Sequence, residues 1–476
     1  IINNLYGVDI MQEATEICKL RLYLKLAGKI EPDYNKPNIG SEPLPDIDFN
    51  IRSGNSLVGF ANYEQVKKAG FDQKLSDNLD ELKQKLNLYL AREYGIDVKK
   101  KHDLEKWINS HQPFHWFIEF YHIINKGGFD VIIGNPPYVE YSKVKKDYEI
   151  KDYETEKCGN LYGFIVERNN KFLQDLGRTG MIIPHSSICT DRMQELQFKL
   201  INQSNLWVST YCIRPSKLFD GVDQRLVIYI LQNKTSKNFI YSSKYHRWYQ
   251  ELRPILFNLL EYTDISQIKF TNSLPKLYCL LENSIWHKLN QFKTLNKFLD
   301  KQKAIYFHNA PRYWIRSMNF APYFWNEKGG EKISSHLKSI YLKTELDSLT
   351  VVAILNSSLF YWWFIILSDC RHLNMREIEN FPIGLDKMSE IVKNRLVEIA
   401  QNLMRDLQNN SFRKKCNYKT TGQVIYDEFY PKLSKPIIDE IDKILAQHYG
   451  FTEEELDFII NYDIKYRMGK DSEEDE

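Results

Sequence analysis

The chain contains 476 residues, of which 43% are hydrophobic and 14% aromatic. This length predicts two or three domains, and this apolar content excludes a chain that is disordered throughout. The formal net charge of +2, from 64 Lys and Arg against 62 Asp and Glu, neither supports nor excludes a nucleic-acid partner.

The N-terminal segment combines a strand pattern with a helix pattern. Residues 3–10 predict a short strand that ends at Asp9 and Ile10, and residues 13–20 predict the helix after it. Residues 1–60 and 129–240 alternate such signals, so we predict that they form one α/β domain.

Residues 61–128 lack strand character and predict helices. Apolar side chains recur at helical spacing at Leu75, Leu79, Leu82, Leu86 and Leu90, and the apolar face continues through Trp107, Phe114, Trp116, Phe117 and Phe120. We therefore expect a helical insertion between two strands of the sheet.

The most informative segment is Asn135-Pro136-Pro137-Tyr138, which follows a β-branched run closed by Gly134. The run predicts a buried parallel strand, and ligands of open α/β sheets bind beyond the carboxyl ends of such strands. Two prolines fix φ and remove two N–H donors, which leaves carbonyl groups free to face a substrate. The alternative is an ordinary X-Pro-Pro loop.

This turn suits an exocyclic amine that must become nucleophilic. The Asn135 oxygen and a proline carbonyl can accept both hydrogens of one amino group and stabilise the positive charge that develops on its nitrogen. Methyl transfer from a sulfonium donor then needs mainly alignment and no strong base. The ring of Tyr138 offers a flat face for stacking.

Further strand and helix patterns follow the turn. Residues 160–164 open an amphipathic helix, residues 177–184 predict a turn into a strand, and residues 226–231 predict another strand after Leu218-Phe219-Asp220. From about residue 241 the composition changes, and aromatic and basic residues interleave at 245–249 and 306–316. Such segments either contact DNA or form an aromatic core with snorkelling arginines.

In their order, these segments resemble the motifs of a gamma-class adenine-specific (N-6) DNA methyltransferase. In particular, they resemble the methyltransferase and target-recognition part of Type IIG restriction–modification proteins. The resemblance implies a Rossmann-like, S-adenosylmethionine-dependent α/β sheet at 1–240, with the helical insertion at 61–128. It also implies an α+β target-recognition domain at 241–385, closed by residues 371–374 and 379–383, and a helical C-terminal region at 386–476.

The resemblance also assigns roles to individual residues. Asn135, Pro136, Pro137 and Tyr138 would be catalytic, and Phe219 would stack on the target base opposite Tyr138 after the base is flipped out of the duplex. S-adenosylmethionine would contact Asp9, Ile10, Asn55, Ser56, Asn135, Leu161 and Phe164. Asp9 would hold the ribose, although an acidic helix cap is an alternative. Asn55 stands where the family commonly has Asp, and Leu161 and Phe164 would pack on the cofactor's adenine unless they belong to the core.

The family's motif I, a glycine-bearing strand–turn for the methionine end of the cofactor, should precede Ile1. We therefore interpret the chain as the C-terminal part of a longer polypeptide, or as one half of a split enzyme. An upstream segment or subunit would then supply motif I, and a nuclease where one is present.

Other patterns bear on partners and location. Basic clusters at 99–101, 143–146 and 413–415 are either solvated faces or phosphate contacts, and 143–146 flanks the catalytic turn. The acidic end at 471–476 masks some of this charge. The seven cysteines are unpatterned, which predicts reduced thiols, no metal site and a cytoplasmic location. The apolar run Leu359 to Leu367 is too short to span a bilayer and predicts a buried helix and no membrane partner.

The expected function is site-specific methylation of adenine in double-stranded DNA within a restriction–modification system. Two alternatives stay open. The chain is a non-catalytic DNA-specificity fragment, or its Asn-Pro-Pro-Tyr turn serves a methyltransferase that acts on RNA or on protein glutamine.

Overall fold

The computed structural model describes residues 3–40, 45–71, 79–202, 204–233, 238–270, 272–419 and 422–469. Ile1, Leu75 and the acidic end at 471–476 lie outside these residues. The chain divides into two compact units, which are described separately. The first comprises Ile1–Ile183, Arg192–Leu206 and Tyr229–Asn238, and the second comprises Pro184–Asp191, Trp207–Ile228 and Phe239–Glu476.

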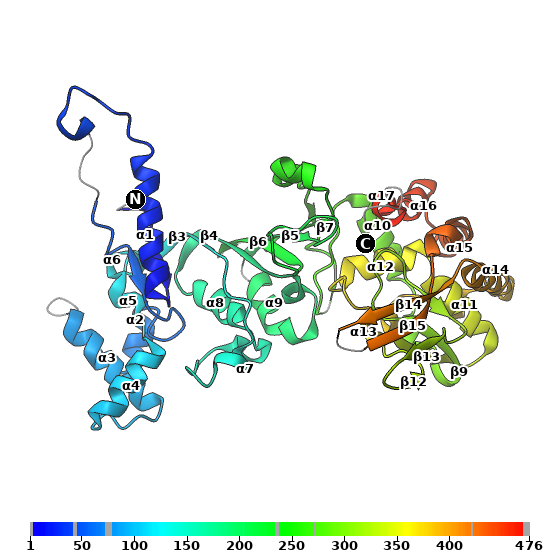
Figure 1. Cartoon of the computed structure of the whole chain (residues 1–476), viewed down its shortest axis with the longest axis horizontal. Helices are drawn as coiled ribbons and strands as arrows, with labels where there is room; N and C mark the ends of the chain where they lie inside the picture. Colours follow the sequence, from blue (N-terminus) through cyan, green and yellow to red (C-terminus); the bar gives the residue numbers. More distant parts are fainter. Residues whose placement is uncertain are drawn as a thin grey trace. The chain divides into compact units, whose positions relative to one another are not determined.

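The first unit begins with a two-stranded parallel sheet. Strand β1 (Gly7–Asp9) pairs with β2 (Ile51–Ser53), and helix α1 (Gln12–Ala27) follows β1 directly (Figure 1). The N–H of Gly54 donates to the carbonyl of Asp9 at 2.9 Å. The carboxyl ends of the two strands therefore lie together.

Every described element between residues 61 and 128 is a helix. These are α2 (Tyr63–Lys68), α3 (Leu79–Glu93), α4 (Lys101–His111), α5 (Trp116–Glu119) and α6 (Tyr121–Ile124). Leu82 and Leu86 of α3 share a core cluster with Phe117 and Ile118. The predicted helical pattern is thus confirmed for the described residues. Its apolar face packs partly within the insertion and partly on residues outside it, as Trp116 does on Phe172 with ring centroids 4.1 Å apart.

A six-stranded mixed sheet follows, in the order β3-β4-β6-β5-β7-β8. Its strands are β3 (Phe129–Gly134), β4 (Leu173–Pro184), β5 (Ser204–Tyr211), β6 (Leu226–Asn233), β7 (Ile240–His246) and β8 (Thr263–Asp264). Strands β3 and β4 are parallel, and β7 and β8 are antiparallel. The helices between β3 and β5 are α7 (Tyr141–Val144), α8 (Leu161–Asn169) and α9 (Gln194–Ile201).

Strand β3 is parallel, as predicted, but it is not buried. It lies at the edge of the sheet, and Val131 and Ile133 are 61% and 80% exposed. These two side chains share one face because alternate residues of a strand point the same way. The apolar residues that led to the prediction of a buried strand therefore lie on a face of β3 that no other described residue covers.

The second unit contains two further sheets, of order β10-β9-β13 and β12-β11-β15-β14. Their strands are β9 (Leu299–His308), β10 (Ser317–Met318), β11 (Phe324–Asn326), β12 (Gly330–Glu331), β13 (Leu337–Leu342), β14 (Phe412–Tyr418) and β15 (Gly422–Glu428). The helices are α10 (Leu280–Leu289), α11 (Glu345–Leu355), α12 (Ser358–Leu367), α13 (Met375–Glu379), α14 (Glu390–Asn409), α15 (Lys435–Tyr449), α16 (Glu453–Ile460) and α17 (Ile464–Arg467).

Residues 386–476 are not helical throughout, contrary to the prediction. The hairpin of β14 and β15 separates α14 from α15. Arg413 and Lys414 of β14 form ion pairs with Asp427 and Glu428 of β15, at 3.0 and 3.2 Å. Such cross-strand pairs stabilise the hairpin. They join residues that are not neighbours in the sequence, so the sequence pattern did not reveal them. They also show that two members of this basic cluster have acidic partners within the chain.

The apolar run near residue 360 forms a buried helix, as predicted. In α12, Ser358 to Ile366 are all buried, and the carboxylate of Asp442 accepts the N–H groups of Ser358 and Leu359, both at 3.1 Å. No single helix in the described ranges is long and apolar enough to cross a membrane. The pair α11 and α12 passes that test only together, with a bend of 67° between them.

Candidate active site

The Asn-Pro-Pro-Tyr turn lies where two parallel strands end. Gly134, the last residue of β3, pairs with Met181 of β4, so Asn135 leaves the sheet beside the carboxyl end of β4. Asn135 and Pro137 are exposed and Pro136 is buried. The buried Pro136 therefore anchors the turn in the first unit, and the turn exposes the polar side chain of Asn135 to solvent.

Tyr138 holds this turn together. Its hydroxyl lies 2.7 Å from Asn135 Oδ1 and 3.0 Å from the carbonyl oxygen of Ile182 in β4. Burial raises the pKa of Tyr138 to about 12, so the hydroxyl stays protonated and acts as a donor. Because an amide oxygen has two lone pairs, Asn135 Oδ1 can accept this bond and a second one from a substrate.

The segment after the turn is attached to the start of α8. The N–H of Leu161 donates to the carbonyl of Val139 at 3.0 Å, and that of Tyr141 donates to the carbonyl of Gly159 at 2.9 Å. Arg192 forms an ion pair with Glu140 at 2.6 Å. The Asn-Pro-Pro-Tyr turn and the predicted helix that begins near residue 160 thus lie next to each other in the first unit.

Leu161 and Phe164 belong to a core cluster with Leu57. Phe164 is fully buried and packs edge-on against Tyr141 and Tyr153, with ring centroids 5.1 and 5.2 Å apart. This packing corresponds to the core alternative that the sequence left open. Contact of either side chain with a cofactor stays a prediction.

Asn55 is buried with one polar group unused. Its Oδ1 accepts the N–H of Leu57 at 3.1 Å, and its own N–H donates to the carbonyl of Gln112 at 2.8 Å. Its Nδ2 has no hydrogen-bond partner among the described residues. A buried donor without a partner is costly, which marks Nδ2 as a group that a ligand or water can satisfy. The neighbouring Ser56 carbonyl accepts from Trp116 and Arg168, both at 3.1 Å.

Asp9 is not the N-cap of α1, because that position is Met11 and no side chain caps the helix. Asp9 Oδ1 accepts the N–H of Met11 at 2.8 Å. The Asp9 side chain is exposed, so this local bond does not prevent contact with a ribose. The two contacts are compatible because a carboxylate has two oxygens and several lone pairs.

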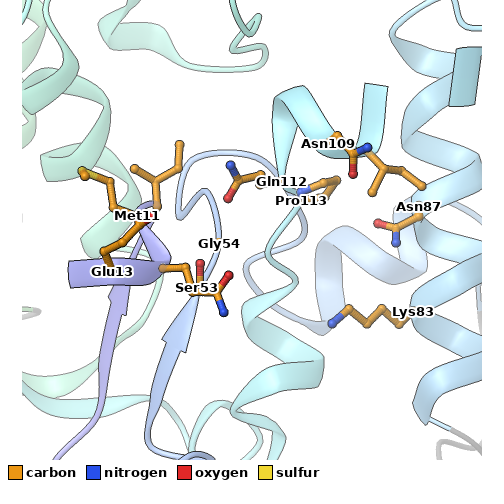
Figure 2. A pocket seen from close by; sticks show the side chains of 12 residues that line it. Met11, Glu13, Ser53, Gly54, Lys83, Asn87, Asn109, Gln112 and Pro113 are labelled. Atoms are coloured by element: carbon orange, nitrogen blue, oxygen red, sulfur yellow. The ribbon is translucent and has the colours of Figure 1, made fainter. Parts of the chain in front are cut away.

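A cavity of about 640 Å³ lies between the segments that follow β1 and β2 and the helical insertion (Figure 2). Its lining includes Ile10 and Gly54, the sequence neighbours of Asp9 and Asn55, but not Asp9 or Asn55 themselves. Residues 10–13 after β1, together with Ser53 and Gly54 after β2, form one part of its lining. The helical insertion forms the other part, with Lys83 and Asn87 of α3 and residues 108–113 around the end of α4. Sequence analysis missed this second part because nothing in the insertion's helical pattern marks its polar residues as binding groups.

Phe219 lies in the second unit, in the loop between β5 and β6, and is partly exposed. Arg253 donates to the carbonyls of Lys217 and Leu218, at 3.0 and 2.6 Å, and so holds the preceding residues. Tyr138 belongs to the first unit. The predicted stacking pair of Tyr138 and Phe219 stays a prediction.

Of the two segments that suggested a DNA surface, the one at 245–249 has a structural role in the second unit. Arg247 is buried, with an ion pair to Asp463 at 3.0 Å and a cation–π contact with Tyr313 at 5.1 Å. This contact shows the core alternative for residues 245–249. In the segment at 306–316, Arg312 is exposed.

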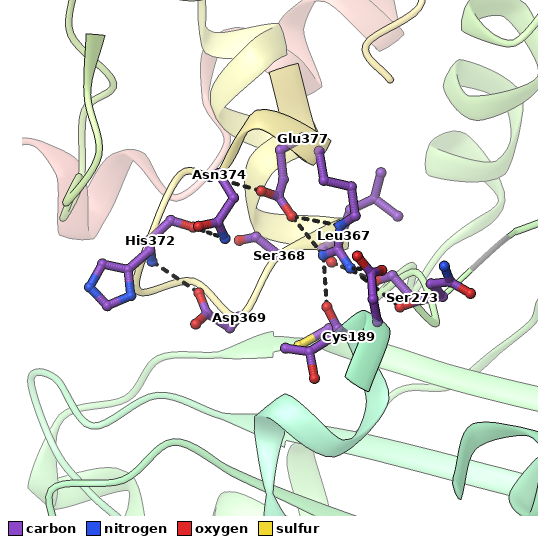
Figure 3. A network of polar contacts seen from close by, with 12 residues as sticks. Cys189, Ser273, Leu367, Ser368, Asp369, His372, Asn374 and Glu377 are labelled. Atoms are coloured by element: carbon purple, nitrogen blue, oxygen red, sulfur yellow. Dashed lines mark hydrogen bonds and ion pairs between the residues drawn. The ribbon is translucent and has the colours of Figure 1, made fainter. Parts of the chain in front are cut away.

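The segment at 371–383 is held by a polar network (Figure 3). Arg376 donates to the carbonyl of Cys189 at 2.7 Å and to Asp191 at 3.0 Å, and it also pairs with Glu377 at 2.6 Å. Glu377 accepts the N–H of Asn374 at 2.9 Å in a capping box of α13. The Arg376 guanidinium is therefore occupied within the protein. No group of three or more potential metal ligands occurs in the described part of the chain.

Comparison with known proteins shows what the segment around this site is similar to. Residues 3–219, which include the Asn-Pro-Pro-Tyr turn, match the sequence model of the Eco57I restriction-modification methylase family. This part of the chain is therefore related to restriction–modification methylases of the Eco57I family.

Two curated relatives agree with this class. RM.MjaORFECS2P of Methanocaldococcus jannaschii, assigned as a type II restriction enzyme and methyltransferase, is 24% identical over 84% of this chain. The type II restriction enzyme and methyltransferase RM.Eco57I of Escherichia coli is 24% identical over 49% of this chain. The matches span 46% and 19% of these relatives' own lengths.

Among solved structures, the chain is similar to the Type IIL restriction–modification enzyme MmeI in complex with DNA, with a TM-score of 0.35 and 9% identity over 72% of this chain and 55% of that one. For the type IIG restriction endonuclease BpuSI the TM-score is 0.25, with 11% identity over 71% of this chain and 54% of that one. The assignment rests on the sequence matches.

Proposed function

We propose that this chain is the methyltransferase and DNA-recognition part of a restriction–modification protein, and that it methylates the exocyclic amino group of adenine in double-stranded DNA. The observation that carries this proposal is the Asn135-Pro136-Pro137-Tyr138 turn at the joined carboxyl ends of β3 and β4. The family match over residues 3–219 supports methyl transfer.

The turn can activate an amine without a base. Asn135 Oδ1 is exposed to solvent on one side and fixed by the Tyr138 hydroxyl on the other. With a neighbouring proline carbonyl, it accepts the two amino hydrogens and stabilises the charge that develops on nitrogen. Tyr138 has a raised pKa, so it orients Asn135 and does not remove a proton.

The residues present fit a nucleoside cofactor. The unpartnered Nδ2 of Asn55 suits an acceptor at the edge of a nucleobase, Asp9 suits a ribose, and Ile10 lines the adjoining cavity. We propose that S-adenosylmethionine binds here with contacts from Ser56, Leu161 and Phe164 as well, and when bound it supplies an electrophilic methyl group.

The target base must leave the duplex to reach this turn, because its amino group is paired in the stack. We propose that Tyr138 and Phe219 stack on the extruded base and offset part of the unstacking cost. Lys143 and Lys146 are exposed directly after the turn and suit phosphate contacts. Residues 241–385 are proposed as the target-recognition domain.

The uncovered face of β3 suggests a further segment. Val131 and Ile133 are apolar and exposed on an edge strand, a combination that single domains usually cover. We propose that an upstream segment or partner subunit packs here and supplies the glycine-bearing strand–turn of motif I.

Sequencing of host DNA tests the proposal. A host that expresses the complete gene should carry N6-methyladenine at one recognition sequence, and a host that expresses the Asn135→Ala variant should not. Modified cytosine in place of adenine, or methyl groups only on RNA or protein glutamine, would exclude this function. Sequence-specific DNA binding without any methylation would favour the non-catalytic specificity fragment.

A further inference from the structure

The helical insertion lines one side of this cavity and is firmly attached to the segment after β2. Gln112 adopts a left-handed conformation, with φ of 43°, and its carbonyl accepts the Asn55 N–H at 2.8 Å. The N–H of Phe114 donates to the carbonyl of Val58 at 2.7 Å. A Cβ added at Gly54 would lie 2.7 Å from the ring of Phe114. The end of α4 therefore has a defined position next to β2.

A buried histidine orients an amide in the wall of this cavity. His115 is fully buried, and its Nδ1 accepts the N–H of Phe60 at 3.3 Å. Its other nitrogen, Nε2, must then carry the hydrogen, which it donates to Asn87 Oδ1 at 3.0 Å. Burial lowers the pKa of His115 to about 3, so the ring stays neutral and keeps this tautomer.

This hydrogen bond defines what Asn87 can offer to a ligand. The bond from His115 fixes which end of the Asn87 amide is the oxygen. That oxygen keeps a second lone pair, and the NH₂ at the other end is the one group of this side chain that can donate, with two hydrogens. The Asn87 side chain extends from α3 toward the cavity (Figure 2). Asn87 is thus a preset donor, and His115 is the residue that positions it.

The charges around the cavity favour a neutral ring over a phosphate. Lys83 lines the cavity, but its ammonium is paired with Glu119 at 2.5 Å. The carboxylate of Glu13 also lines the cavity and disfavours an anion. The other polar lining groups include the amides of Asn109 and Gln112, which suit the mixed donors and acceptors of a nucleobase. The volume of about 640 Å³ lies in the usual range for small-molecule sites.

We infer that Asn87 binds the nucleobase of the nucleoside cofactor, by donating from its NH₂ to a ring nitrogen, and that His115 positions it for this contact. The inference rests on the proposed function, because it places the cofactor's nucleoside in this cavity. It gives the helical insertion a role in cofactor recognition.

Saturation-transfer NMR with millimolar adenosine and the 476-residue chain tests this inference. Adenosine lacks the methionine end of the cofactor, so its binding does not depend on motif I. Asn87→Asp is nearly isosteric and keeps an acceptor for His115, but it replaces the donor with an acceptor. We expect the apparent affinity for adenosine to fall about tenfold in this variant. Gln84→Ala, an exposed amide on the same helix outside the lining, should bind like the unchanged chain.

The outcomes separate the inference from the proposed function. If Asn87→Asp binds adenosine as the unchanged chain does, while Asp9→Ala weakens binding, the nucleoside site stands and the role of Asn87 is wrong. If the wild-type chain gives no saturation-transfer signal with adenosine, the placement of the cofactor in this cavity is wrong, and the inference is wrong with it. Circular dichroism of each variant checks that the fold is retained.

Discussion

The hydroxyl of Tyr138 lies between two acceptors, Asn135 Oδ1 and the Ile182 carbonyl, and it has one hydrogen to share. The contact with Asn135 orients the amide, and the contact with Ile182 attaches the turn to β4. Tyr138 therefore combines an aromatic face with a hydrogen bond that defines the position of its neighbour. These two contributions can be tested separately by substitution.

Asn135→Ala in the complete enzyme should lower the rate of methyl transfer by several orders of magnitude while DNA binding persists. The substitution removes an acceptor that acts mainly in the transition state, an effect of about 3–4 kcal/mol at comparable sites. Single-turnover transfer of labelled methyl groups measures it, with the exposed Asn125→Ala as control. Turnover close to that of the unchanged enzyme would exclude Asn135 from catalysis.

Tyr138→Ala and Phe219→Ala should each weaken extrusion of the target base by roughly 1–3 kcal/mol, because each removes one stacking face. Tyr138→Phe should retain extrusion and lower kcat about tenfold, because the ring stays while the hydroxyl's contacts with Asn135 and the Ile182 carbonyl are lost. Fluorescence of 2-aminopurine at the target position reports extrusion. An unchanged signal in Phe219→Ala would show that Phe219 is not part of the stacking pair.

At the scale of elements, helix α12 depends on a buried carboxylate. Asp442 accepts the first two N–H groups of this helix, and burial raises its pKa from the ordinary 3.8 to about 6. The folded chain therefore keeps a proton on Asp442 over a pH range in which the unfolded chain has lost it. The stability that this group contributes is present below pH 3.8 and is lost as the pH rises to about 6.

Urea unfolding between pH 4 and pH 7 should reveal this loss. The free energy of unfolding should fall by roughly 2–3 kcal/mol more in the unchanged chain than in Asp442→Asn, which has no titrating group at this position. Glu454→Gln, at an exposed site in α16, should leave the pH dependence unchanged. Equal pH profiles for the unchanged chain and Asp442→Asn would contradict the assignment.

For the whole molecule, the described contacts account for only part of a cofactor site. Asp9, Ile10 and Asn55 suit the nucleoside, and motif I is expected from an upstream segment or subunit. The cofactor is expected to have three contact regions, at its ribose, its adenine and its methionine end. Loss of the last should weaken the binding free energy by several kcal/mol, and each 1.4 kcal/mol is a tenfold change in affinity. The 476-residue chain alone should therefore bind S-adenosylmethionine weakly, if at all, and should not methylate DNA.

Calorimetry with the isolated chain measures this affinity, and addition of the upstream segment or partner should restore both binding and activity. Hydrogen exchange along β3 should slow on the same addition, because its exposed edge becomes covered. Micromolar binding of S-adenosylmethionine by the chain alone would show that its pocket is already complete.

Features whose causes are local could be predicted from the amino-acid sequence. The prolines of the Asn-Pro-Pro-Tyr turn fix its backbone, and the spacing of apolar residues marks α3, α8 and α12 as helices and β6 as a strand. The order of the motif segments resembled that of a methylase, and the family match over residues 3–219 agrees with that resemblance.

Features that depend on residues far apart in the chain could be seen only in the folded protein. The edge position of β3 depends on strand order, and the hairpin of β14 and β15 belongs to a sheet in which β15 also pairs with the sequence-distant β11. The burial of Phe164 depends on Tyr141 and Tyr153, and the donor role of Asn87 depends on His115, 28 residues away. Apolar periodicity reports which face of an element is buried, but not which partner covers it, because that choice is made by packing between elements.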